Sequence, residues 1–302
     1  MNWSSEENVK IAYRLLTVRG YGPAQTNRLL FSLKPYVTNP RQLENSIENI
    51  LKPQDLPAFE KVVELFQKDN KVGYISMLDE QLYPTSLRML LHQNSPTILS
   101  YMGNLNLLAK RKVGFSGSRK ASPKGLWITE DCVSQLAEKD VCVVSGYASG
   151  IDLAAHKTAL EKNGSTIIVL PEGISYFYIK PDLKEVWDWN RVLVVSEFMP
   201  YDNWMASRAM KRNQTIIGLS NAMIVVEAGV TGGSMDAGLK TLLSAKTLFV
   251  PVFKEAPESA AGNEILIQRG ARPLKLKRQT MRVNVDEVEK SVMDNTSDSL
   301  FN

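Results

Sequence analysis

The segment VCVVSGYASGIDLAAHKTALEKNGSTIIVL, residues 141–170, contains two apolar stretches separated by a glycine-flanked turn and a longer mixed segment. The stretches at 141–145 and 166–170 are almost continuously apolar, which is typical of strands covered on both faces of a parallel sheet. Residues 151–162 between them predict a helix. The segment therefore predicts a strand, a crossover helix and a second parallel strand, the repeating unit of an α/β fold.

The same alternation continues on both sides of this unit. Further apolar strands are predicted at 112–116, 191–196, 222–227 and 247–252, and helices at 126–138 and near 234–245. Alternation over residues 109–281 predicts a doubly wound α/β domain with a mostly parallel sheet. In such a domain, ligands bind beyond the carboxyl ends of the strands, in the loops that lead into the next helix.

Three flanking segments differ in character from this domain. Residues 1–72 predict a helical unit, 73–108 a connector that extends the sheet, and 282–302 a polar, loosely ordered tail. The predicted helices are at 8–18, from Pro23 through Leu30, at 43–51 and at 57–66, and the predicted connector strands are at 73–77 and 97–102. The helical unit is compatible with two interpretations, a small nucleic-acid-binding or protein-docking module and a helical cap that packs on its neighbour.

Composition excludes several classes of protein. The chain has 302 residues, of which 44% are hydrophobic and 23% charged, with a formal charge of +4, two cysteines and two histidines. No apolar run approaches the roughly 20 residues of a membrane-spanning helix, and no leader peptide is recognised, so we expect a cytoplasmic protein with no membrane partner. Two cysteines cannot form a disulfide framework, and no zinc-ligand spacing exists. We therefore expect no metal and no cofactor.

The first candidate loop follows the strand predicted at 112–116. Gly117 allows close approach of the backbone to a ligand, and Ser118 offers a hydroxyl group. Arg119 offers a planar fork of donors that suits phosphate. The loop fits neither the Walker pattern nor GxGxxG, so neither nucleotide fingerprint applies. A phosphate site is favoured over the alternative, a tight turn with a solvated basic rim.

The next residues strengthen the prediction of an anion site. Ser122 is placed to cap the following helix, whose first amides would face a bound anion. Lys124 belongs to a group of six basic residues, with no acidic one, between positions 110 and 124. Because charge matters through its position rather than its total, this cluster is more informative than the net charge of +4.

The second candidate loop connects the strand at 141–145 to the next helix. Gly146 and Gly150 permit tight contact between its backbone and a ligand. Asp152 and His156 lie four residues apart on the same helix face, so they are expected to hydrogen-bond. No suitable nucleophile is nearby, and a structural pair is therefore favoured over an acid–base dyad.

The third candidate loop spans residues 171–189 and interleaves aromatic residues with lysines, among them Lys180. Unstacked bases and a phosphate backbone are recognised by this combination of rings and cations. Packing against the sheet is the alternative, and we favour it for Trp187 and Trp189.

The fourth candidate region joins a basic segment to a glycine-rich turn that leads into a helix. The residues of interest are Lys211, Arg212, Asn213, Gly233 and Ser234. The turn is a second plausible cradle for an anion. Glu227 ends a strand nearby, and we expect its carboxylate to orient Arg212 rather than to act as a base.

Taken in order, these loops resemble the DNA-processing protein A family (DprA, also called Smf). The matching text includes GSR at 117–119, SGYASGIDLAAH at 145–156, RN at 212–213, VVEA at 225–228 and GS at 233–234. The resemblance covers about residues 76–272. The helical N-terminal segment resembles the SAM-like domain of the family more loosely.

The resemblance implies an extended Rossmann domain, usually dimeric, that binds single-stranded DNA without strong sequence preference. It implies protection of incoming strands during natural transformation, help in loading the RecA recombinase during DNA recombination, and no enzymatic activity. The family's phosphate pocket falls on Gly117, Ser118 and Arg119, and its basic loop residue falls on Lys180. The segment Arg212-Asn213 is a further contact implied by the resemblance.

The sequence departs from the family pattern near that segment. Ala209 and Met210 stand where the family commonly has an aromatic residue and a proline, and Gln214 stands where a second arginine is usual.

Two other functions remain open from the sequence. The first is an enzyme or sensor for a nucleotide, similar to phosphoribohydrolases of the Lonely Guy type, which use a glycine-rich turn and a carboxylate. Glu227 followed by the turn at 232–234 keeps part of that pattern, although in a different order. The second is a DprA-like sensor of DNA or a nucleotide in phage defence or plasmid biology.

Overall fold

The structure is a computed structural model that describes residues 1–65 and 72–294. The chain forms two compact units. Unit 1 comprises residues 1–102, 172–177 and 195–203, and unit 2 comprises residues 103–171, 178–194 and 204–302.

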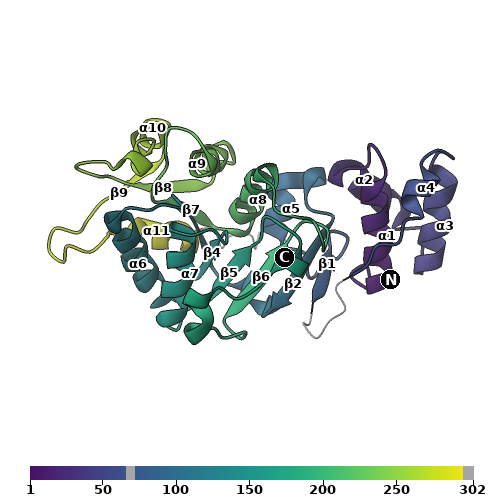
Figure 1. Cartoon of the computed structure of the whole chain (residues 1–302), viewed down its shortest axis with the longest axis horizontal. Coiled ribbons are helices and arrows are strands. Elements are labelled where there is room, and N and C mark those ends of the chain that lie inside the picture. The colour runs from purple at the N-terminus through teal and green to yellow at the C-terminus, as the bar shows by residue number, and fades with distance from the viewer. Residues whose placement is uncertain (66–71, 295–302) are drawn as a thin grey trace. The chain divides into compact units, whose positions relative to one another are not determined.

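Unit 1 begins with four helices around an apolar core. They are α1 (Glu6–Thr17), α2 (Pro23–Leu33), α3 (Pro40–Ile50) and α4 (Leu56–Phe59), which are coloured purple to dark blue in Figure 1. Leu15, Leu30 and Ile47 are fully buried in the shared core. Pro23 opens α2 as predicted, because its missing N–H costs nothing in a first helical turn.

The fourth helix is shorter than the prediction of 57–66. It ends at Phe59, and position 66 lies outside the described residues. Arg14 Nε donates to the Phe59 carbonyl oxygen at 2.5 Å, and Thr17 Oγ1 donates to the Ala58 carbonyl oxygen at 3.0 Å. These carbonyl groups would accept the next hydrogen bonds of a longer helix, so contacts with α1 compete with its continuation.

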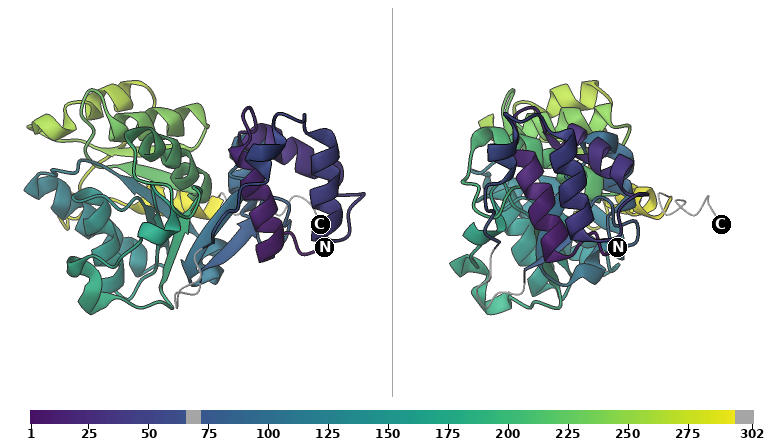
Figure 2. Two further views of the ribbon diagram at one scale, coloured as in Figure 1. Left: turned by 45° about the vertical axis from the view of Figure 1, so that its right-hand side comes forward. Right: turned by 90° about the vertical axis from the view of Figure 1, so that its right-hand side faces the viewer.

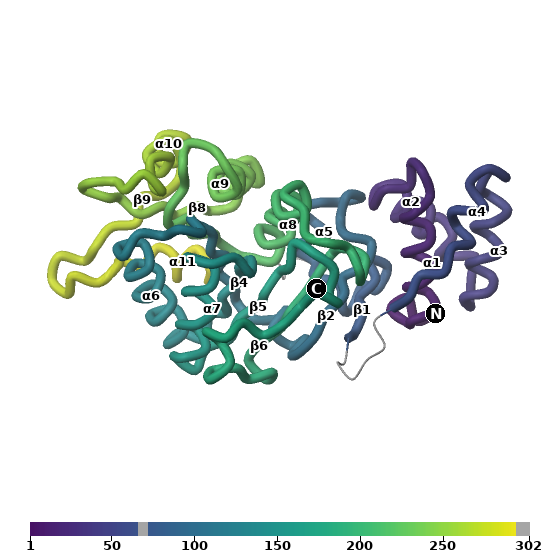
Figure 3. The backbone as a smooth tube through the Cα atoms, in the orientation of Figure 1, coloured from purple at the N-terminus to yellow at the C-terminus, as the bar shows by residue number. Residues whose placement is uncertain are grey.

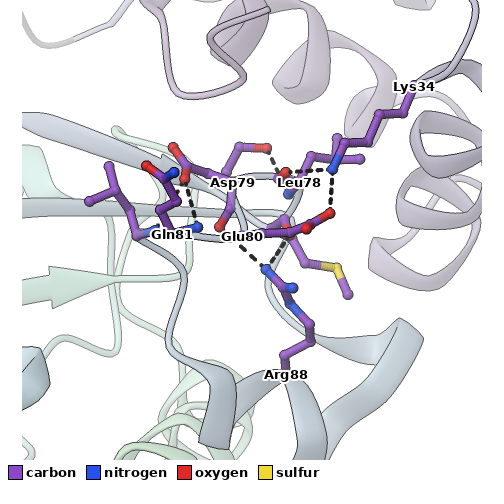
Figure 4. Close-up of polar contacts among 9 residues, drawn as sticks. Lys34, Leu78, Asp79, Glu80, Gln81 and Arg88 are labelled. Atoms are coloured by element: carbon purple, nitrogen blue, oxygen red, sulfur yellow. Dashed lines mark hydrogen bonds and ion pairs between the residues drawn. The ribbon is translucent and has the colours of Figure 1, made fainter. Parts of the chain in front are cut away.

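Unit 1 also contains β1 (Gly73–Ser76) and β2 (Ile98–Gly103), which pair antiparallel. The helix α5 (Thr85–Leu91) between them was not predicted from the sequence. Figure 4 shows how side chains fix the segment after β1. Lys34 Nζ bonds to the Leu78 carbonyl oxygen and to Glu80, and Arg88 donates to the Asp79 carbonyl oxygen.

Unit 2 is a doubly wound α/β domain, as predicted. Its strands are β3 (Lys112–Ser116), β4 (Cys142–Ser145), β5 (Thr166–Val169), β6 (Val192–Ser196, which ends in unit 1), β7 (Ala222–Val225), β8 (Thr247–Pro251) and β9 (Arg272–Leu274). Its helices are α6 (Pro123–Ala137), α7 (Ile151–Glu161), α8 (Ala206–Leu219), α9 (Gly233–Leu243), α10 (Asn263–Gln268) and α11 (Asp286–Asp294). Neighbouring strands from β5 through β9 pair in parallel.

Helices cover both faces of this sheet. On one face, the core includes Val113 and Phe115 of β3 together with side chains of α6, α7 and α11. Helices α8 and α9 contact strands from the other side, and Figures 1 and 2 show them opposite α6 and α7. Coverage on both faces explains why the strands are continuously apolar. Within the part of the chain that the structure describes, no helix is both long enough and apolar enough to cross a membrane.

The prediction of a loosely ordered tail from residue 282 is wrong for the residues of α11. Val288 and Val292 of this helix are buried in the core of unit 2. Two apolar side chains one turn apart are enough to dock a short helix, although the surrounding sequence is polar.

The strand order creates a crevice between β3 and β7. From β3 the chain winds outward through β4 and β5, whereas β7, β8 and β9 continue on the opposite side of β3. Figure 3 shows the backbone of the sheet, with β4 and β5 labelled on one side of this reversal and β8 and β9 on the other. At such a reversal, the loops after adjacent strands turn away from each other and leave room for a ligand. The loops after β3 and β7 belong to two of the four candidate binding regions predicted from the sequence.

Candidate functional site

A cavity of about 460 Å³ lies within unit 2 at this reversal. Of the residues selected from the sequence, those that line it are Gly117, Ser118, Arg119, Arg212, Asn213, Gly233 and Ser234. They come from the loop after β3, from α8, and from the start of α9. Separate segments that the sequence analysis expected to converge therefore do meet.

The loop after β4 holds the turn after β3 in place. The Ile151 backbone N–H donates to the Ser118 carbonyl oxygen at 3.2 Å. Gly150 has φ +74°, and a methyl group at this position would lie 2.2 Å from the same oxygen. Only glycine allows this approach, so the loop after β4 fixes the loop after β3 through backbone contacts.

Arg119 extends from this turn toward solvent. Its side chain is exposed, and none of the residues described in the structure forms a hydrogen bond or ion pair with its guanidinium group. The guanidinium carbon lies 5.6 Å from the centroid of the Trp204 ring, within the range of a cation–π contact. The donor fork of Arg119 is therefore available to a phosphate group.

We expected the carboxylate of Glu227 to orient Arg212, and this expectation is wrong. It is fully buried and accepts hydrogen bonds from both the backbone N–H and the hydroxyl group of Ser122. Ser122 in turn caps α6, because its Oγ accepts from the Gly125 backbone N–H at 3.0 Å. The carboxylate thus fixes the start of α6 against the end of β7.

Arg212 is buried, with only 6% of its surface exposed. Its Nη1 donates to the Val169 carbonyl oxygen at 2.9 Å. Asp152 is a buried neighbour, and burial raises the pKa of its carboxyl group, while the positive charge of Arg212 acts in the opposite direction. Arg212 therefore differs from Arg119, because its guanidinium group is engaged inside the protein.

The expected hydrogen bond between Asp152 and His156 is not formed. The ring nitrogens of His156 lie 2.5 Å from the Gly146 carbonyl oxygen and 2.7 Å from Thr166 Oγ1. Because a carbonyl oxygen can only accept, Nε2 carries the proton and donates to Gly146. Burial lowers the pKa of His156 to about 4 and keeps the ring neutral. His156 is thus held by Gly146 and Thr166 rather than by Asp152.

The start of α9 forms another wall of the cavity. Asn213 Nδ2 donates to the Gly233 carbonyl oxygen at 3.1 Å and lies 3.3 Å from Asp236 Oδ2. These contacts hold α8 against the first turn of α9. Gly233 and Ser234 of that turn line the cavity, and the N-terminus of a helix suits a bound anion.

The other selected residues do not line the cavity. Lys124 and Lys211 are exposed, and Lys124 Nζ lies 5.7 Å from the Phe253 ring centroid. Gly146 is buried beside the Arg212 guanidinium group. Lys180 Nζ donates to the Tyr147 carbonyl oxygen at 2.5 Å and lies 4.5 Å from the centroid of that ring.

The long loop before β6 contributes less to the cavity than its composition suggested. Trp187 and Trp189 pack edge to face on each other with centroids 5.1 Å apart, and Trp189 remains exposed. The aromatic residue that does line the cavity is Trp204, just before α8. No regular spacing marked Trp204, since it follows an irregular segment. Trp204 and Arg119 are far apart in the sequence and come close only through the tertiary fold.

The charge of the cavity is mixed rather than strongly positive. Its lining includes Arg119 and Arg212 but also Asp152 and Glu227. Both carboxylates and Arg212 are buried and engaged, whereas Arg119 is exposed. Among the described residues, no three His, Cys, Asp or Glu side chains are grouped so as to hold a metal ion.

Fold and site together define a Rossmann-like α/β protein with an exposed arginine at a cleft beyond its strand ends. Residues 74–284 match the family model of DNA recombination-mediator protein A, and the chain belongs to this family.

Similar proteins agree with this assignment. The chain is 34% identical to DNA processing protein DprA of Streptococcus pneumoniae over 210 residues, which cover 69% of this chain and 73% of that protein. The X-ray structure of the S. pneumoniae protein matches with a TM-score of 0.69 at 27% identity, covering 89% of this chain and 94% of that one. The DNA processing protein A of Helicobacter pylori shares the fold, with a TM-score of 0.60 at 23% identity, covering 77% and 99% of the respective chains.

Proposed function

We propose that this protein binds single-stranded DNA and acts as a recombination mediator. The sugar–phosphate backbone would enter the cleft between the loops after β3 and β7. Arg119 would neutralise a phosphate group, supported by the Ser118 hydroxyl and the first turn of α9. Such contacts are independent of base identity, so we expect binding without strong sequence preference.

The observation that carries this proposal is the exposed guanidinium group of Arg119 at the switch point of the sheet, with no hydrogen-bond or ion-pair partner among the described residues. A charged arginine fork beside backbone N–H groups is suited to phosphate oxygens. Membership of the recombination-mediator family supports DNA as the source of those phosphates. The H. pylori protein binds single-stranded DNA. Its similarity to this chain is a similarity of fold.

The remaining parts of the proposal concern partners and organisation. We expect the protein to work in the cytoplasm as a homodimer, to protect incoming strands during natural transformation and to help load RecA. We expect a binding protein rather than an enzyme. Helices α1 to α4 would form a SAM-like domain within residues 1–72, followed by the sheet extension of 73–108 and the Rossmann-like domain of 109–281. Lys180, Lys124 and Lys211 would extend the contact surface around the cleft.

A binding assay with three ligands tests the proposal. Fluorescence anisotropy would compare a labelled single-stranded oligonucleotide with its duplex, and unlabelled mononucleotides would serve as competitors. We expect the single strand to bind more tightly than the duplex, and mononucleotides to compete poorly because one phosphate supplies few contacts. Equal binding of duplex, or strong competition by a mononucleotide, would contradict the proposal. A RecA filament-assembly assay on the same oligonucleotide would test the mediator role.

A further inference from the structure

The tryptophan beside Arg119 is one of several large apolar side chains of unit 2 that remain exposed. Trp204 leaves 47% of its surface exposed, although an indole ring gains free energy when it is buried. It lines the cavity, two residues before α8. An exposed ring at the wall of a cavity, adjacent to a cation, is an arrangement that suits a planar ligand.

The distance between the side chains of Arg119 and Trp204 indicates which class of ligand could contact both. The guanidinium carbon of Arg119 lies 5.6 Å from the centroid of the Trp204 ring. A nucleotide presents a negatively charged phosphate and an aromatic base a short distance apart. The pair can therefore engage the phosphate and the base of a single nucleotide, with the charge on Arg119 and the base against the indole ring.

We infer that Trp204 is a base-stacking residue that, together with Arg119, forms a seat for one nucleotide of the bound single strand. The inference rests on the proposed function and adds base recognition to it. Phosphate contacts position the strand, whereas stacking requires an unpaired base, because the bases of a duplex are already stacked on each other. Stacking on Trp204 would therefore make the affinity of the cleft for single-stranded DNA higher than its affinity for duplex DNA.

Other exposed tryptophans provide a matched control. Trp127 on α6 has 40% of its surface exposed, close to the value for Trp204, but it is not part of the cavity lining. Replacement of either tryptophan by alanine removes an indole ring of similar exposure from the surface. Only the Trp204 ring should affect contact with a base.

The test compares two oligomers of equal length, an oligothymidylate and one in which every nucleotide is abasic. Trp204→Ala, Trp204→Phe and Trp127→Ala would be measured against the wild-type chain by anisotropy. We expect Trp204→Ala to weaken oligothymidylate binding by roughly 5- to 150-fold, the effect of one lost base–aromatic stack, and to leave abasic binding unchanged. Trp204→Phe keeps a ring and should recover part of the affinity, and Trp127→Ala should bind both oligomers as the wild type does.

Three results would overturn the inference. Wild-type affinity of Trp204→Ala for oligothymidylate would remove the ring from the site. Equal losses on both oligomers would show that Trp204 affects phosphate contacts or folding rather than a base. A wild-type chain that binds neither oligomer would contradict the proposed function itself, and the stacking role would fall with it. The first of these results, when the wild type binds both oligomers, contradicts the stacking role alone.

Discussion

Arg212 and Asp152 meet over the backbone of Gly146. A methyl carbon at Gly146 would lie 1.9 Å from Nη1 of Arg212 and 2.5 Å from Oδ2 of Asp152, so the two charged groups occupy the space beside this glycine. Both side chains are buried. Their opposite charges and the hydrogen bond from Arg212 to Val169 tie α8 to α7 and to the end of β5.

The first prediction is that Arg212 contributes to stability. Arg212→Ala leaves the Asp152 carboxylate buried near no compensating guanidinium group, and removal of one partner of a buried pair costs about 3–5 kcal/mol. We expect a loss of this order in the free energy of unfolding, measured by urea denaturation. The double variant Arg212→Ala with Asp152→Asn should recover part of the loss, since the amide carries no charge. Wild-type stability of Arg212→Ala would contradict this account of the pair.

The second prediction concerns the pH dependence of stability. The pKa of His156 is lowered from 6.5 to about 4 in the folded chain because the ring is buried. The unfolded chain therefore binds a proton in a range where the folded chain does not, and stability is lost as pH falls from about 7 toward 4. For this residue alone, the free energy of unfolding should fall by about 2 kcal/mol between pH 7 and pH 5.

His156→Gln should remove this part of the pH dependence, whereas the exposed His92 provides a matched control in His92→Gln. An NMR titration offers a second readout, because the chain has two histidines. A His156 ring that titrates near 6.5 in the folded protein would contradict the assignment of a neutral, buried imidazole.

The third prediction tests the backbone contact between two loops of the site. Gly150→Ala would place a methyl group 2.2 Å from the Ser118 carbonyl oxygen and 2.8 Å from that of Arg119, so the turn that carries Arg119 must shift. We expect a loss of about 1–3 kcal/mol in stability together with weaker binding of single-stranded DNA.

Gly270→Ala is the control for backbone strain alone. Gly270 also has a positive φ, +111°, but nothing lies within 4 Å of a methyl group added there. This variant should lose stability without loss of DNA binding. If Gly150→Ala binds the oligonucleotide as tightly as Gly270→Ala does, the contact with Ser118 does not position the site.

Much of the fold could be predicted from the sequence because of its physical pattern. Strands buried on both faces must be continuously apolar, which located β3, β4 and β5 to within a residue or two. Helices α5, α8, α10 and α11 were not predicted. Helix α8 begins in a polar, basic segment, and Val288 and Val292 are the residues of α11 in the apolar core, within a polar sequence.

The site was predictable in its location but not in the roles of its residues. Parallel strands bring their carboxyl ends to one edge, so the loops with Gly117 and Gly233 were expected to converge. Sequence spacing does not distinguish an exposed Arg119 from a buried Arg212, since burial depends on how α8 packs. For the same reason, the partners of Glu227 and the place of Trp204 required the structure.

The central claim is that Arg119 neutralises a phosphate of bound single-stranded DNA. The most direct measurement is the salt dependence of oligonucleotide affinity for the wild type, Arg119→Ala and the neighbouring Lys120→Ala, whose side chain is exposed but is not part of the cavity lining.

We expect Arg119→Ala to weaken binding by about 1–3 kcal/mol and to make the slope of log affinity against log salt shallower by about 0.7, the value for one lost phosphate contact, with little change in stability. Lys120→Ala should change both quantities less. An Arg119→Ala chain with the affinity and salt slope of the wild type would contradict the claim.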